Sequence, residues 1–313
     1  MSELVDFGEG RKLFVEVSGQ GPPLVSMHGA PVLSSLAPPL RTGSAECKSE
    51  TGLGGSTNLF PIADELAQSV GRTVIRFDFE GAGQSPLSAR GLSLDSYLDS
   101  VTLVLSHAGF KLDELKKDLV LYGHSMGALV AQHFAARHAG AVQAVILSCP
   151  GAPRDPSQAA AGPAKFMAPL IELARSVGTF NMATNTASRN VRARATRAEL
   201  AAVRASVQLS SGEAYAQTCE AVQAAPGVEL DRLDMPVLVI AGRHDVISNA
   251  ANAQKLIGAS LDSALVNVGD SYVTRTDGLT RSPKTVLEVV EAGHQPALEA
   301  PDKVIELVTA FLS

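Results

Sequence analysis

Short apolar runs recur along the chain, and each ends at a glycine, a polar residue or a proline. Six runs have this form: Leu24–Met27, Thr73–Phe77, Leu119–Tyr122, Val142–Leu147, Pro236–Ala241 and Thr285–Val290. Their apolar residues are largely consecutive rather than alternating, which is typical of strands covered on both faces of a parallel sheet. The stretch Phe7–Val17 differs, because its pattern predicts an antiparallel hairpin at the start of this sheet.

Helical spacing of apolar residues occupies the segments between several of these runs. The segments are 58–69, 94–108, 128–138 and 249–257. Strands that alternate with helices predict a doubly wound α/β fold with a mostly parallel sheet and helices on both faces.

Three segments interrupt the alternation. Residues 31–56 and 269–284 are rich in loop-forming residues, so we expect two long loops there. Residues 151–228 lack a strand pattern and contain helical stretches at 167–177, 194–209 and 212–225. We therefore expect residues 1–150 and 229–313 to form the core, and residues 151–228 to form an inserted helical cap.

Composition narrows the class of protein. The chain has 313 residues, of which 45% are hydrophobic, and this balance excludes a fully disordered chain. The net charge of −6 makes nucleic acid an unfavourable partner. No apolar run is long enough to span a membrane. The start of the chain has no secretory pattern, and Cys47, Cys149 and Cys219 form no disulfide framework, so we expect a cytoplasmic protein.

The strongest chemical signal is the motif Gly123-His124-Ser125-Met126-Gly127. It follows a predicted strand and precedes a predicted helix, which is the context of a nucleophile elbow. Glycines on either side of Ser125 permit the tight turn that lifts its hydroxyl above the edge of the sheet. We expect Ser125 to be a catalytic nucleophile.

A serine hydroxyl needs a general base and a group that orients the base. Asp245 and His294 each follow a predicted strand, in the chain order Ser, Asp, His that this fold uses. We expect them to complete a catalytic triad with Ser125. Asp270 and Asp277 are the alternatives for the acid.

Two backbone N–H groups are expected to bind the oxyanion. One belongs to Met126, directly after the nucleophile, and the other to Ala30 in the loop that begins at His28-Gly29. Pro31 has no N–H and cannot serve. We expect His28 to brace this loop and His124 to point away from the reaction centre.

Together these motifs resemble the α/β-hydrolase superfamily in its serine-hydrolase branch, over nearly the whole chain. The turn 78–85 contributes to the likeness, and residues 211–222 resemble the cap of small-substrate lactonases and esterases such as 3-oxoadipate enol-lactonase. The resemblance implies hydrolysis of a small carboxylic ester or lactone through an acyl-serine. It leaves open C–C bond hydrolysis, thioester or amide cleavage, acyl transfer, or a non-catalytic binding protein.

The remaining site predictions concern the substrate pocket and ligands. We expect His28, Gly29 and His124, which lie in motifs beside the nucleophile, to line the substrate pocket. We expect cap residues to form the pocket roof: Phe166, Met167, Leu170 and Phe180. The arginines between 189 and 204 are interpreted as a solvated helix face. No zinc, dinucleotide or Walker pattern is present, so we expect neither a metal nor a cofactor. The sequence does not determine an oligomeric state.

Overall fold

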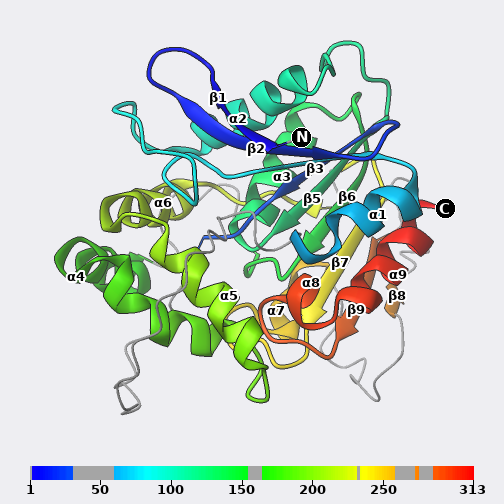
Figure 1. The fold of residues 1–313 in the computed structure, drawn as a ribbon. Coiled ribbons are helices and arrows are strands. Elements are labelled where there is room, and N and C mark those ends of the chain that lie inside the picture. Colours follow the sequence, from blue (N-terminus) through cyan, green and yellow to red (C-terminus); the bar gives the residue numbers. More distant parts are fainter. Residues whose placement is uncertain (1, 31–59, 154–163, 231–232, 258–271, 275–284) are drawn as a thin grey trace.

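The computed structural model describes residues 2–30, 60–153, 164–230, 233–257, 272–274 and 285–313 (Figure 1). Within these ranges nine strands form one sheet in the order β1-β2-β4-β3-β5-β6-β7-β9-β8. The strands are β1 (Ser2–Asp6), β2 (Lys12–Ser18), β3 (Pro23–Met27), β4 (Thr73–Phe77), β5 (Leu119–His124), β6 (Val142–Ser148), β7 (Val237–Gly242), β8 (Tyr272–Thr274) and β9 (Thr285–Val290). The six strands from β4 to β9 in this order are parallel, and the outer strands β1, β2 and β8 pair antiparallel.

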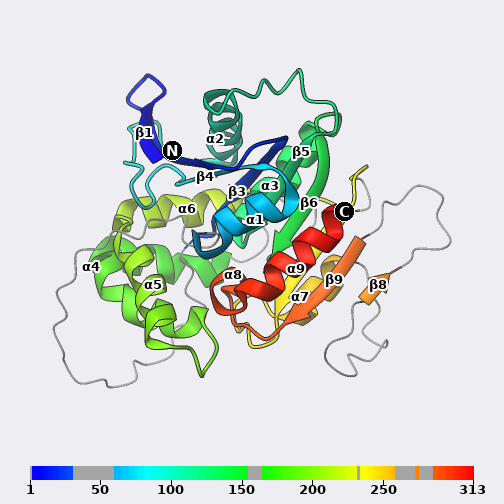
Figure 2. The same cartoon turned by 45° about the vertical axis from the view of Figure 1, so that its right-hand side comes forward.

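Two apolar layers cover the sheet, because successive strand residues point to opposite faces. On one face Val25 and Leu121 belong to the core cluster that includes α2 (Leu94–His107), α3 (Met126–Arg137) and α7 (Ala250–Leu256). On the other face Leu24 and Val120 pack with α1 (Ala63–Val70) and α9 (Pro301–Leu312). Figure 2 shows α1 and α9 lying side by side over this second face.

A group of helices separates β6 from β7 in the chain. It comprises α4 (Ala164–Asn190), α5 (Arg197–Gln208) and α6 (Gly212–Ala224), which lie together beside the sheet in Figure 1. Gly178 interrupts the helical backbone of α4 with φ 72° and ψ 161°. A separate apolar cluster holds α4 to α6: Met167, Leu170, Ala174, Met182, Tyr215 and Cys219.

Register brings the functional loops to one edge. Met27 in β3 pairs with Gly123 in β5, and His124 at the end of β5 pairs with Ser148 at the end of β6. The parallel strands β7 and β9 end beside each other at Gly242 and Val290. Residues that follow these strands therefore meet at the carboxyl edge of the sheet.

The α/β fold and all six predicted parallel strands are confirmed. The predicted hairpin is displaced, because its first strand is Ser2–Asp6 and residues 7–11 form the turn. Residues 272–274 form strand β8 where we expected only loop, and the C-terminal helices α8 (Pro296–Glu299) and α9 had not been predicted. The predicted loop 31–56 and most of 269–284 lie outside the described residues. Among the described helices, none is long and apolar enough to cross a membrane.

Candidate active site

Ser125 stands at a sharp turn between β5 and α3. Its backbone has φ 52° and ψ −111°, a conformation that costs energy in a residue with a side chain. The flanking glycines are required by close approach: a Cβ at Gly123 would lie 2.3 Å from the carbonyl oxygen of Gly127, and one at Gly127 would lie 2.2 Å from that of Met27. The turn therefore has no room for a side chain at position 123 or at position 127.

His294 joins Ser125 to Asp245. Its Nδ1 lies 2.7 Å from Oδ2 of Asp245, and its Nε2 lies 3.0 Å from Oγ of Ser125. A carboxylate can only accept a hydrogen bond, so Nδ1 carries the proton of the neutral imidazole and Nε2 accepts from the serine hydroxyl. The three side chains come from loops after β5, β7 and β9, and all three are buried.

The Asp245 carboxylate is held by three hydrogen bonds, two from its own loop and one from His294. Its Oδ1 accepts hydrogen bonds from the backbone N–H groups of Ile247 at 2.7 Å and Ser248 at 2.9 Å. Burial acts to raise the pKa of Asp245, but the interaction with His294 and these hydrogen bonds outweigh burial and lower the pKa to about 2. Asp245 therefore stays ionised at neutral pH.

Residues from the helical segment and from α8 fix the loop that carries His294. The backbone N–H of His294 donates to the Asn190 carbonyl at 2.8 Å. The buried carboxylate of Glu299 accepts from the N–H groups of Gly293 at 2.9 Å and Arg192 at 2.8 Å. Sequence reasoning missed Asn190 and Glu299, and it grouped Arg192 with a solvated face although Arg192 also pairs with Glu199 and Glu299.

His28 braces the loop after β3. Its Nε2 accepts a hydrogen bond from the Phe79 N–H at 2.9 Å, so the proton lies on Nδ1, which donates to the Gly29 carbonyl at 2.8 Å. Burial lowers the pKa of His28, which keeps the ring neutral. His28, Gly29, Ala30 and Met126 all line one small cavity.

The described residues leave this cavity a volume of only about 10 Å³, roughly the space that one water molecule needs. Its other described lining residues come from the turn after β4, from α2, from the turn between α5 and α6, and from α6: Phe79, Glu80, Gly81, Ala82, Tyr97, Ser210, Ala214, Tyr215 and Thr218. The volume lies below the usual range for sites of drug-sized ligands, roughly 300–1,000 Å³. The described lining residues therefore leave little free space beside Met126 and Ala30.

The predicted roof residues occupy other places. Met167 and Leu170 are buried in the cluster between α4 and α6 and do not line the cavity. Phe180 is 66% exposed, because the helix restarts in a new direction after Gly178 and buries Thr179 and Met182 instead. The side chain of Phe166 lies outside the described residues. His124 is buried, with its ring 4.9 Å from that of His294, and it does not line the cavity either.

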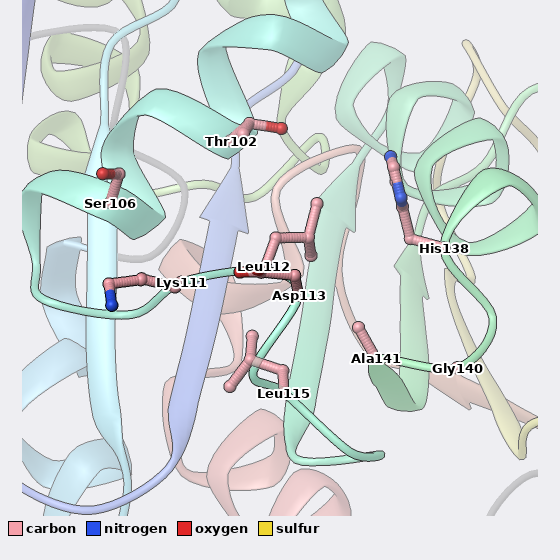
Figure 3. A pocket seen from close by; sticks show the side chains of 9 residues that line it. All are labelled: Thr102, Ser106, Lys111, Leu112, Asp113, Leu115, His138, Gly140 and Ala141. Atoms are coloured by element: carbon pink, nitrogen blue, oxygen red, sulfur yellow. The ribbon is translucent and has the colours of Figure 1, made fainter.

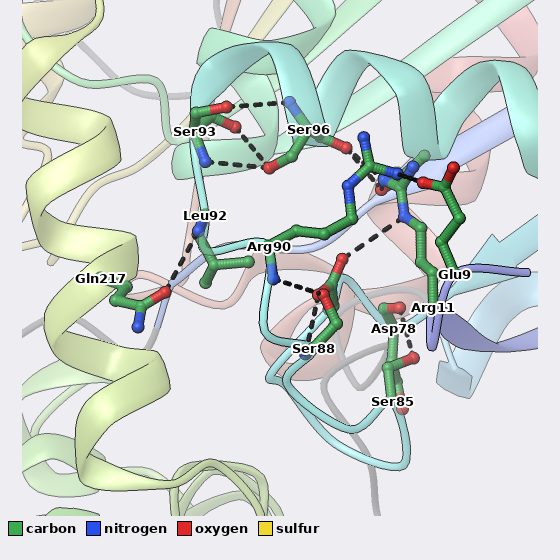
Figure 4. Close-up of polar contacts among 12 residues, drawn as sticks. Glu9, Arg11, Asp78, Ser85, Ser88, Arg90, Leu92, Ser93, Ser96 and Gln217 are labelled. Atoms are coloured by element: carbon green, nitrogen blue, oxygen red, sulfur yellow. Dashed lines mark hydrogen bonds and ion pairs between the residues drawn. The ribbon is translucent and has the colours of Figure 1, made fainter.

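The turn after β4 connects the core to α6. Buried Glu80 forms an ion pair with Arg11 and accepts a hydrogen bond from the Ser88 N–H. The Leu92 N–H donates to Oε1 of Gln217 in α6 at 3.1 Å (Figure 4). In α2, the Tyr97 hydroxyl donates to Thr218 at 3.0 Å. The cavity is thus closed by polar contacts between the core and α6.

A second, more open hollow lies at the opposite edge of the sheet (Figure 3). Its lining residues come from α2, from the loop before β5 and from the turn before β6: Thr102, Ser106, Lys111, Leu112, Asp113, Leu115, His138, Gly140 and Ala141. Ser125 follows the carboxyl end of β5, so this hollow is remote from the nucleophile.

A parallel sheet with a strained serine between strand and helix, backed by histidine and aspartate after later strands, defines the α/β-hydrolase class. Within this class, the chain belongs to the Hydrolase_4 family, described as serine aminopeptidase, S33, whose model matches residues 52–265. The chain is therefore a hydrolase enzyme, as the sequence predicted. No curated protein matches it.

Solved structures with the same fold include esterases and a lactonase. An enol-lactonase from Burkholderia xenovorans LB400 has a TM-score of 0.69 and 20% identity, with 97% of each chain covered. A thermophilic esterase from Thermogutta terrifontis has a TM-score of 0.71 and 20% identity, covering 100% of this chain and 97% of that one. An esterase from Exiguobacterium antarcticum has a TM-score of 0.69 and 18% identity, covering 100% of this chain and 99% of that one. At these identities the likeness concerns the fold.

Proposed function

We propose that this protein is a serine hydrolase that cleaves a small carboxylic ester or lactone through an acyl-serine intermediate. The observation that carries the proposal is the chain of contacts from Ser125 through His294 to Asp245, at 3.0 Å and 2.7 Å. These are the distances expected of a nucleophile, a general base and the group that orients the base.

In the first half of the reaction Ser125 Oγ attacks the substrate carbonyl carbon. His294 Nε2 takes the hydroxyl proton, and Asp245 stabilises the imidazolium that forms. The proton then passes from Nε2 to the leaving alkoxide oxygen, and the C–O bond breaks to give the acyl-serine. In a lactone the leaving hydroxyl remains tethered to the acyl chain.

The second half returns the enzyme to its starting state. Water gives a proton to His294 Nε2 and attacks the acyl carbon, and Ser125 leaves with that proton. In both halves the negative charge on the carbonyl oxygen is stabilised by the N–H groups of Met126 and Ala30. The position of Met126 at the start of α3 supports this role, because the amino end of a helix favours negative charge.

The narrowness of the cavity beside Met126 and Ala30 favours a small acyl group over a large one. Its one acidic lining residue, among those described, is Glu80, and this carboxylate is already satisfied by Arg11 and the Ser88 N–H. A substrate that presents an amino group would therefore meet no free anion there. This favours an uncharged ester or lactone over the α-amino substrates implied by the family's description.

We also propose that residues 151–228 act as a cap that shapes this cavity. Ser210, Ala214, Tyr215 and Thr218 contribute to its lining, and Asn190 holds the loop of His294. These contacts support a direct role for the insertion in substrate choice.

Two measurements test the proposal. A fluorophosphonate probe should label the wild type at Ser125 and fail to label Ser125→Ala, which separates an active serine hydrolase from a binding protein. A panel of p-nitrophenyl esters of graded acyl length, enol-lactones, aryl lactones, thioesters and amino-acid anilides should show highest kcat/KM for short acyl esters or lactones. Preference for an anilide or a long acyl chain would contradict the proposed substrate class.

A further inference from the structure

Cys149 lies directly against the acid and base of the site, although no step of the proposed mechanism uses it. It follows β6, has a left-handed φ of 46°, and is held there by its N–H, which donates to the Ile240 carbonyl at 2.7 Å. Its side chain is fully buried, with Sγ 4.0 Å from the carbonyl oxygen of Gly293. The next residue in the chain after Gly293 is His294.

The thiol therefore forms a compact group with two other ligand-bearing side chains. One ligand atom from each of Cys149, Asp245 and His294 lies within 4.8 Å of the others. Thiolate sulfur, imidazole nitrogen and carboxylate oxygen are the three donor types that bind Zn²⁺, usually four to a tetrahedral site. Mg²⁺ prefers oxygen ligands and octahedral geometry, so this set selects a thiophilic cation.

We propose that Cys149, Asp245 and His294 form an inhibitory binding site for a thiophilic divalent cation, for which Zn²⁺ is the probe. The metal would bind between Sγ of Cys149, a carboxylate oxygen of Asp245 and Nδ1 of His294. Two of these residues are the acid and base of the proposed triad, so occupancy and turnover exclude each other.

The proton balance explains the inhibition. Zn²⁺ replaces the proton of the Cys149 thiol, which leaves to solvent as H⁺. Metal on Nδ1 of His294 displaces the proton there, and the neutral imidazole then carries its proton on Nε2. An N–H facing Ser125 cannot accept the hydroxyl proton, so the serine loses its base.

Burial predicts the time course. Cys149 and His294 have no exposed surface, and Asp245 is 4% exposed. A cation reaches the ligands only when the surrounding loops open, so inhibition should develop during preincubation rather than on mixing.

The first test measures metal binding without activity. Wild-type protein, equilibrated with Zn²⁺ against a chromophoric chelator, should bind one ion that Cys149→Ala and Cys149→Ser lose. Removal of even an outer partner of a metal ligand weakens binding about 10–100-fold, so each variant should lose at least that much. His294→Ala, followed by binding alone, should lose the ion as well. Cys219→Ala and Cys47→Ala are the matched cysteine controls and should bind as the wild type does.

The second test measures ester hydrolysis after preincubation with Zn²⁺. Wild type, Cys219→Ala and Cys47→Ala should lose activity slowly and regain it with EDTA, whereas Cys149→Ala and Cys149→Ser should remain active. Mg²⁺ should have no effect on any of them. Equal binding and inhibition in wild type and both Cys149 variants would overturn the proposal, as would wild-type protein that binds no Zn²⁺. Binding that depends on Cys149 but leaves activity intact would instead contradict the role given to His294 in the proposed function.

Discussion

The carboxyl edge of the sheet and the helical segment α4–α6 meet at one cavity but are held by different forces. At the edge, Ser125, Asp245 and His294 follow strands that are hydrogen-bonded to their neighbours, and hydrogen bonds of 2.7 Å and 3.0 Å connect their side chains. The helical segment depends on two small apolar clusters and on side-chain contacts, some of them exposed ion pairs such as Arg175 with Glu213. Such exposed pairs contribute little to stability.

This difference assigns the reaction chemistry to the edge of the sheet and the choice of substrate to the helical segment. The positions of the reacting atoms are set by backbone pairing, which tolerates few changes. The lining from α6 is set by side-chain packing, which can change one residue at a time. Substitutions at the edge should therefore alter the rate of every substrate, and substitutions in α6 should alter the preference among substrates.

The largest effect is expected at the nucleophile. Ser125→Ala should lower kcat by about 10⁴–10⁶-fold for all substrates, because the three side chains act as a unit. Circular dichroism and thermal unfolding should remain close to wild type, since Ala is smaller than Ser and leaves the turn in place. Substantial residual turnover would show that another residue is the nucleophile.

The acid should have the next largest effect. Asp245→Asn places an amide N–H₂ against Nδ1 of His294, which favours the tautomer with its proton on Nε2, and kcat should fall by about 10⁴-fold. Asp234→Asn, an exposed aspartate before β7, is the matched control and should retain wild-type kcat. If Asp270→Asn or Asp277→Asn, both outside the described residues, gave the large loss instead, the acid would be wrongly assigned.

A paired substitution tests the division between packing and selectivity. Tyr215→Ala and Leu170→Ala each remove a buried side chain from the same cluster, and each should lower the free energy of unfolding by about 2–5 kcal/mol. Only Tyr215 lines the cavity, so only Tyr215→Ala should move the preference toward longer acyl chains. Ester-length profiles of kcat/KM measure this, and identical shifts in both variants would contradict the assignment of the lining.

A smaller effect is expected where the core meets α6. Tyr97→Phe removes the hydrogen bond to Thr218, whose own hydroxyl still donates to the Ala214 carbonyl at 2.8 Å. The free energy of unfolding should fall by about 0.5–1.5 kcal/mol, measured by urea denaturation, with KM changed more than kcat. Phe180→Ala, at an exposed position, should change stability by less than about 0.5 kcal/mol. A kcat loss in Tyr97→Phe as large as in Asp245→Asn would remove the distinction between the two regions.

The sequence predicted the residues at the carboxyl edge of the sheet better than the side-chain positions in the helical segment, and the reason is physical. Ser125, Asp245 and His294 each follow a strand whose apolar pattern is visible, and parallel strands bring their carboxyl ends together. The direction of Phe180 depends instead on Gly178, where a single φ of 72° turns the helix. Its glycine is visible in the sequence, but the new direction of the chain is not.

The residues around His294 were missed for a different reason. Glu299 and Arg192 are 107 positions apart, and their contact depends on how α8 meets the end of α4. No local pattern signals such a pair. The buried thiol of Cys149 was likewise treated only as a cysteine without a disulfide partner, because its neighbours come from the loops after β7 and β9.

The protein uses the imidazole rings of two histidines, His28 and His294, in opposite ways. His294 must gain and release a proton in every turnover, whereas His28 serves only while it remains neutral, because a proton on Nε2 would face the Phe79 N–H. Burial lowers the pKa of His28 below its ordinary value of 6.5, so the unfolded chain takes up a proton there before the folded chain does. By linkage, the contribution of His28 to stability is present above pH 6.5 and declines as the pH falls below it. The loop expected to hold the oxyanion therefore carries its own acid limit, set by a residue that takes no part in proton transfer.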